Sequence, residues 1–96
     1  MEEFVPCRKI SVYLNGRNDD GSPKGFNFFV RTIEATELER FVIETLDIFD
    51  IPNDGVDIFA CPDLPSQMMR NKDSILNEIS RYKENLDIEA KKSSNK

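Results

Sequence analysis

The side chains of this sequence that could do chemistry are two cysteines and 18 acidic residues, because the 96 residues include no histidine. A Ser-His-Asp or Cys-His catalytic arrangement and a histidine-ligated metal are therefore excluded. Cys7 and Cys61 lie too far apart for a CxxC redox motif, and two thiols cannot build a four-cysteine zinc site. They could form one disulfide. Because the acidic N-terminal residues carry no apolar signal segment, we expect instead two reduced thiols in a cytoplasmic protein.

The acidic residues could supply an acid–base pair or a metal site, but no motif marks either one. The sequence contains no Gly-rich phosphate loop, Walker motif or dinucleotide-binding motif. A calcium loop around Asp54 is also excluded. Aligning Gly55 with the invariant glycine of such a loop places Pro52 at the third ligand position and Cys61 where a bidentate glutamate is required. We therefore expect a non-catalytic protein without a metal or cofactor.

One motif suggests nucleic-acid binding. Residues 24–30 read KGFNFFV and are similar to the RNP1 motif of RNA-recognition domains, whose strand aromatics stack on bases. That fold requires a helix and a strand between its first strand and RNP1, and here only a short loop lies there. We therefore expect Phe26 and Phe28 in the core. The net charge of −5 also disfavours nucleic acid as a partner, and a contact through Phe29 and Tyr13 is the alternative that stays open.

Hydrophobic periodicity predicts the elements that carry these residues. Ile10, Val12 and Leu14 alternate with their neighbours in the period of a half-buried strand. A second strand over 26–31 follows the polar loop 15–23, so the two strands form a hairpin.

A helix and a third strand follow the hairpin. Thr36 and Glu39 form a capping-box pattern, which predicts that the helix starts at Thr36. Apolar residues then recur at helical spacing as far as Phe49, and Pro52 ends the helix. Alternating apolar residues predict a third strand over 56–61, which the next proline closes.

Beyond the third strand, the pattern predicts a loop and then a second helix over 74–84. Leu86 and Ile88 could form a short last strand, and residues 91–96 are expected to be a disordered tail. Residues 1–90 then form one α+β domain with a ββαβ core, a second C-terminal helix and a possible last strand. This is the element order of the ubiquitin-like β-grasp. No apolar stretch is long enough to cross a membrane.

Acidic residues are concentrated in the middle of the chain. Residues 34–63 hold nine acidic residues and one basic residue, a net charge of −8, whereas both flanking segments are weakly basic. On the predicted helix and the turn after it, these acids form one face: Glu37, Glu44, Asp47, Asp50 and Asp54. This face is either an ordinary solvated helix surface or a docking surface for a basic protein partner, where complementary charge would speed encounter.

Residues 9–16 read KISVYLNG and resemble the opening strand of doublecortin domains, which commonly carries a basic residue, alternating aliphatics and then Tyr-Arg-Asn-Gly. The resemblance continues in residues 38–42 and 55–63, and it spans 8–63. It implies a ubiquitin-like fold that binds microtubules or another cytoskeletal partner. It further implies that the partner-binding residues are the bases near the first hairpin: Arg8, Lys9, Arg17 and Lys24.

Two non-catalytic functions follow from these observations. The first is a doublecortin-like module that associates with microtubules, tubulin or another cytoskeletal or scaffold protein, in the cytoplasm or on the cytoskeleton. The second is a ubiquitin-like protein-binding or dimerisation domain that uses the acidic helix face or an exposed sheet edge, with no direct microtubule binding. Neither the partner nor the oligomeric state can be read from the sequence.

Overall fold

The computed structural model describes residues 3–94, with side chains through Lys91. It contains three strands, two helices and two short 3-10 turns, in the order β1 (Phe4–Arg17), β2 (Pro23–Arg31), η1 (Thr32–Glu34), α1 (Ala35–Ile48), β3 (Asn53–Pro65), η2 (Ser66–Met68) and α2 (Lys72–Ser94). The predicted α+β class and the ββαβ order with a second helix are confirmed. None of the described helices combines the length and apolarity needed to cross a membrane.

The three strands form one antiparallel sheet in the order β2-β1-β3, with β1 in the centre. Ile10 lies opposite Phe28 on one side and Ile58 on the other, and this register places the apolar residues of all three strands on one face. Alternation along each strand turns the remaining side chains to the opposite face.

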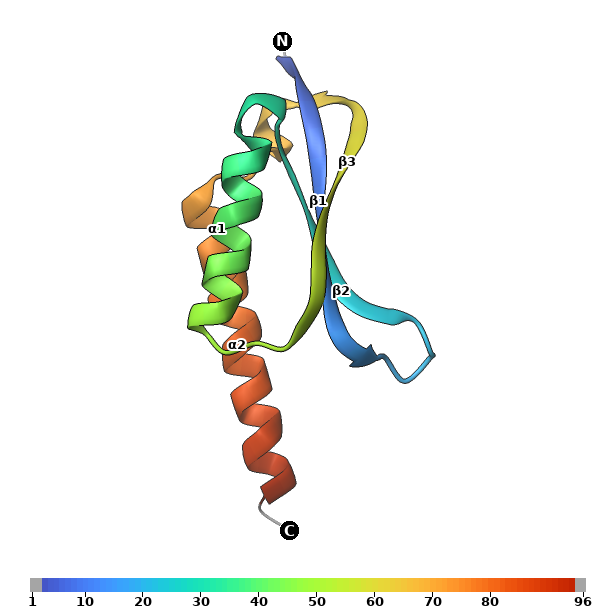
Figure 1. The fold of residues 1–96 in the computed structure, drawn as a ribbon, viewed down its shortest axis with the longest axis vertical. Coiled ribbons are helices and arrows are strands. Elements are labelled where there is room, and N and C mark those ends of the chain that lie inside the picture. The colour runs from blue at the N-terminus through green and yellow to red at the C-terminus, as the bar shows by residue number, and fades with distance from the viewer. Residues whose placement is uncertain (1–2, 95–96) are drawn as a thin grey trace.

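Both helices cover the same face of the sheet, and the opposite face carries no helix (Figure 1). The core between them contains fully buried residues from every layer: Ile10, Val12, Phe28, Val30, Val42, Leu46, Ile75 and Ile79. The predicted apolar stripe of the first helix is thereby confirmed, because Leu38, Val42 and Leu46 are buried while Phe41 and Phe49 pack at its margin.

The ends of α1 differ from the prediction. The helix begins at Ala35, directly after η1, and its N-cap residue Glu34 makes no side-chain capping bond. Thr36 therefore lies inside the helix, and the predicted capping box is wrong because the 3-10 turn leads the chain into the helix earlier. At the other end, the amide of Ile51 donates to the carbonyl of Leu46 at 2.9 Å, while Asp50 adopts φ 56°. This is a Schellman-type ending, in which an aspartate takes the left-handed position.

Strand β3 is longer than predicted, because Pro62 does not end it. The register shifts between the pairs Cys7–Cys61 and Val5–Leu64, so Pro62 lies in a bulge. A proline is tolerated there, since β3 is an edge strand and the bulge already interrupts the ladder.

Helix α2 is also longer than predicted. Residues Leu86 to Glu89 lie within it, so the possible last strand is wrong, and the helical spacing of Tyr82 and Leu86 against the core explains why. No strand in the described part of the chain runs parallel beside β1, and the β-grasp is not confirmed. Residues 91–94 belong to α2, while 95–96 lie outside the described residues. The C-terminal part of α2 extends past the end of the sheet (Figure 1).

Candidate functional site

The four basic residues predicted to bind a partner do not form one surface. Lys9 lies opposite Phe29 and Phe59, on the helix-free face of the sheet, so its neighbour Arg8 is turned to the other face. Arg17 and Lys24 lie at the far end of the hairpin, where Arg17 pairs with the residue before Lys24. The set is therefore divided between two faces and two ends of the sheet.

The hairpin loop also carries acidic residues that offset its bases. The Oδ1 atom of Asp20 accepts hydrogen bonds from the Ser22 hydroxyl at 2.6 Å and from the Ser22 amide at 2.9 Å, and these bonds lower the pKa of Asp20. The Asp20 carboxylate is thus favoured in the same loop in which the Arg17 guanidinium donates to the carbonyl of Gly21 at 2.9 Å. The loop presents mixed charge rather than a basic patch.

Three of the predicted acidic residues converge at the C-terminal end of α1. Glu44, Asp47 and Asp50 line one open groove of about 520 Å³, together with Ile43 and Ile51. The C-terminal end of a helix carries a partial negative charge, which adds to the field of the carboxylates. We call this surface the acidic groove. It combines negative charge with apolar side chains, and Ile43 remains 47% exposed there.

Two of the five predicted acidic residues lie apart from the acidic groove: Asp54, which lines a separate hollow with Tyr13 and Arg17, and Glu37. Glu37 lies near the start of α1. It forms an ion pair with Lys72 of α2, at 2.7 Å between Oε1 and Nζ. The Lys72 ammonium donates a hydrogen bond and supplies positive charge, so the pKa of Glu37 is lowered and that of Lys72 is raised. The same ammonium lies 5.9 Å from the ring centre of Phe41. Glu37 therefore links α1 to α2.

The helix-free face of the sheet carries an aromatic row that sequence reasoning missed in part. Phe29, Lys9 and Phe59 lie side by side on the three strands, and the Lys9 ammonium lies 5.3 Å from the Phe59 ring centre. Alternation within each strand predicts Phe29 and Phe59 opposite the apolar face, but the register that brings both beside Lys9 could not be read from the sequence. Tyr13 lies further along between Gly25 and Gly55.

The predicted core positions of Phe26 and Phe28 in the RNP1-like motif are confirmed. Phe28 is fully buried, and Phe26 packs edge-on against it with ring centres 5.3 Å apart. Neither ring is available on the open face to stack on a base, as RNP1 aromatics must be.

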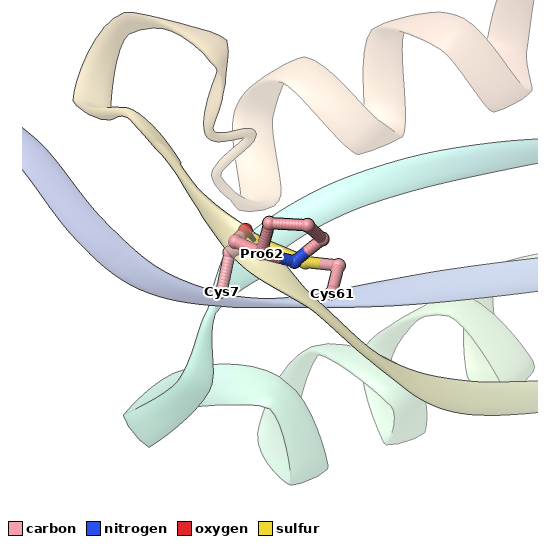
Figure 2. Close-up of a disulfide and its surroundings, with 3 residues drawn as sticks. All are labelled: Cys7, Cys61 and Pro62. Atoms are coloured by element: carbon pink, nitrogen blue, oxygen red, sulfur yellow. Dashed lines mark hydrogen bonds between the residues drawn. A yellow bond between two sulfur atoms is a disulfide. The ribbon is translucent and has the colours of Figure 1, made fainter.

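The two cysteines form a disulfide, so the expectation of two reduced thiols is wrong. Cys7 on β1 lies directly opposite Cys61 on β3, with their Cα atoms 5.9 Å apart, and the carbonyl oxygen of Pro62 lies 2.6 Å from the Cys7 sulfur (Figure 2). This Cα separation is within the range that a disulfide needs. Strand register brings the two residues together, and register could not be read from their positions in the sequence.

No group of three or more histidine, cysteine, aspartate or glutamate side chains in the described part of the chain is arranged to hold a metal ion. Comparison of the chain with protein-family models, curated proteins and solved structures finds no match. Three surfaces of the described chain could bind a partner. They are the acidic groove, the helix-free face of the sheet and the open edge of the sheet.

Proposed function

We propose that this chain is a non-catalytic protein-interaction module that binds a basic partner segment at the acidic groove. The observation that carries the proposal is the convergence of Glu44, Asp47 and Asp50 on one groove, while the predicted basic residues are dispersed. Carboxylates around exposed apolar side chains suit a partner that presents lysine or arginine beside aliphatic residues. Charge of this kind speeds encounter and selects partners, and the apolar contact adds affinity.

The proposal can be tested with a fluorescently labelled lysine-rich peptide and its binding measured by anisotropy. The variant Glu44→Gln/Asp47→Asn/Asp50→Asn removes the three charges of the groove. We expect it to bind roughly five- to tenfold more weakly at low salt, since exposed ion pairs contribute up to about 1 kcal/mol each. The matched control Glu78→Gln/Glu84→Gln/Glu89→Gln removes the same charge from exposed positions on α2. An equal loss in both variants would mean general charge attraction and would contradict the proposal.

A second candidate is doublecortin-like association with microtubules, tubulin or another cytoskeletal protein, within a ubiquitin-like β-grasp family. The observation in its favour is that Arg17 pairs with the residue next to Lys24, which brings two of the bases to one end of the hairpin. The strongly acidic microtubule surface would attract such a pair, although the two aspartates of the loop oppose it.

Co-sedimentation with stabilised microtubules at low and moderate salt tests this second candidate. The variant Arg17→Ala/Lys24→Ala should reduce the pelleted fraction, while the matched variant Arg81→Ala/Lys91→Ala on α2 should not. Absence of pelleting by the unmodified chain at both salt concentrations would exclude direct microtubule binding and would leave the acidic groove as the partner site.

A further inference from the structure

The outer edge of β3 is an open hydrogen-bonding surface of the sheet. β3 pairs with β1 along one side and is the last strand in the sheet order, so its other side has no strand partner within the described residues. The opposite edge, on β2, is partly covered, because the Arg70 amide donates to the Phe29 carbonyl at 2.8 Å. Open edges can pair with another chain, and proteins commonly protect them with lysine, proline or a covering segment.

β3 carries a register shift near each end. One lies at Pro62, and the other lies at Asp54, between the pairs Tyr13–Gly55 and Leu14–Asn53. Residues 55–61 form a continuous edge between the two shifts. The exposed charged side chains at the start of this edge and within it are aspartates, Asp54 and Asp57, rather than lysines. Two copies of this edge would bring carboxylates together, which disfavours pairing of the chain with itself.

The side chains beside this edge alternate in chemistry. Val56 and Ile58 face the helices and are only partly buried, whereas Asp57 and Phe59 lie on the helix-free face. The acidic groove reaches Asn53, the first residue of β3, and so extends from the end of α1 to the start of β3. Along the edge, an incoming strand would therefore meet apolar side chains on its helix-facing side and a carboxylate on the other.

We infer that the outer edge of β3, over residues 55–61, accepts an extended partner segment as a fourth strand, and that this segment alternates apolar and basic residues. The inference rests on the proposed function, because it specifies the backbone conformation and the residue pattern of the basic partner that the function requires. Backbone hydrogen bonds supply sequence-independent affinity, while alternate side chains supply specificity. The partner's apolar residues cover Val56 and Ile58, its basic residues meet Asp57, and its end enters the acidic groove.

The probe for this inference is a nine-residue peptide of alternating valine and lysine, added to the full chain. We expect the amides among residues 55–61 that face away from β1 to exchange hydrogen at least about tenfold more slowly when the peptide is bound, since strand pairing protects amides. The amides of β2 serve as the internal reference and should change little. Protection on β2 instead of β3 would overturn the inference.

Two further peptides keep every side chain of the probe but carry N-methyl groups on alternate backbone amides, one peptide on the odd-numbered residues and the other on the even-numbered residues. One of the two therefore lacks the N–H groups that would form hydrogen bonds with β3. We expect at least about tenfold weaker binding of that peptide, because several backbone hydrogen bonds are lost together. Equal affinity of all three peptides would show that only side chains bind, and would overturn strand addition while the proposed function stands.

The two proposals can fail separately. If the variant lacking the three groove carboxylates binds the peptide as tightly as the unmodified chain, with β3 amides still protected, the acidic groove is not the partner site and strand addition is supported. If the chain without peptide is a dimer in sedimentation experiments and its β3 amides are already protected, the edge is occupied by a second copy and the inference is overturned.

Discussion

The ring centre of Tyr82 on α2 lies 5.8 Å from the ring centre of Phe26 on β2. This contact lies where α2 crosses the hairpin end of the sheet, and with Leu86 it is part of the margin of the core. Burial raises the pKa of the Tyr82 phenol, and the nearby negative charge of Glu89 raises it further. The docked position of Tyr82 therefore favours the neutral phenol.

Alkaline pH should weaken this docking. The pKa of Tyr82 is higher in the folded chain than its usual value of 10.0. The stability that the neutral phenol contributes is therefore fully present below pH 10, and it is lost as the pH rises through the pKa of the folded chain. We expect Tyr82→Phe to reduce the fall in the free energy of unfolding above pH 10, measured by urea denaturation at a series of pH values. Tyr13→Phe, on the other face of the sheet, is the matched control. An equal reduction in both variants would contradict the role of Tyr82.

Leu46 and Ile48 test the packing of α1 against the sheet. Leu46 is fully buried, whereas Ile48 is 77% exposed on the same helix. We expect Leu46→Ala to lower the free energy of unfolding by about 2–5 kcal/mol, because it removes buried methyl groups and leaves a cavity. Ile48→Ala should change it by less than about 0.5 kcal/mol. Urea denaturation measures both, and similar losses would mean that Ile48 is covered in solution.

Reduction of the Cys7–Cys61 disulfide should destabilise the fold. The bond joins residues 54 positions apart, and closing a loop of that length removes entropy from the unfolded chain worth about 4 kcal/mol in the chain-entropy account. We expect a reducing agent to lower the free energy of unfolding by about 2–4 kcal/mol. The variant Cys7→Ala/Cys61→Ala should be insensitive to the reducing agent. An unfolding transition that does not move on reduction of the unmodified chain would contradict the bond.

Gly25 lies where β2 approaches β1 too closely for a side chain. A Cβ atom at this position would overlap the backbone carbonyl oxygen of Val12, and relief would require movement of the strand pair. We expect Gly25→Ala to cost about 1–3 kcal/mol, as overpacking commonly does. Gly21→Ala is the comparison, because a Cβ there meets no atom and only the φ of +89° opposes it. Urea denaturation should show the greater loss for Gly25→Ala.

Local patterns predicted much of the fold, and their failures have physical causes. Alternation placed Ile10, Val12 and Phe28 on the buried face, and helical spacing identified the stripe of α1, since each pattern depends on residues close in sequence. The prediction that Pro62 ends the third strand is wrong because an edge bulge can accommodate proline. The prediction of a last strand rests on the local alternation of Leu86 and Ile88, and it is wrong because contact of Tyr82 and Leu86 with the core favours a continuous helix.

For the candidate site, the order of residues along the chain defines which charges are available and where they are concentrated. The folded arrangement then places Glu44, Asp47 and Asp50 in one groove, pairs Glu37 with Lys72 and separates the four bases. It also brings Cys7 to Cys61 and Phe59 to Lys9. Such pairs depend on strand register and helix docking. Both are set by contacts between residues far apart in the chain, which local periodicity does not encode.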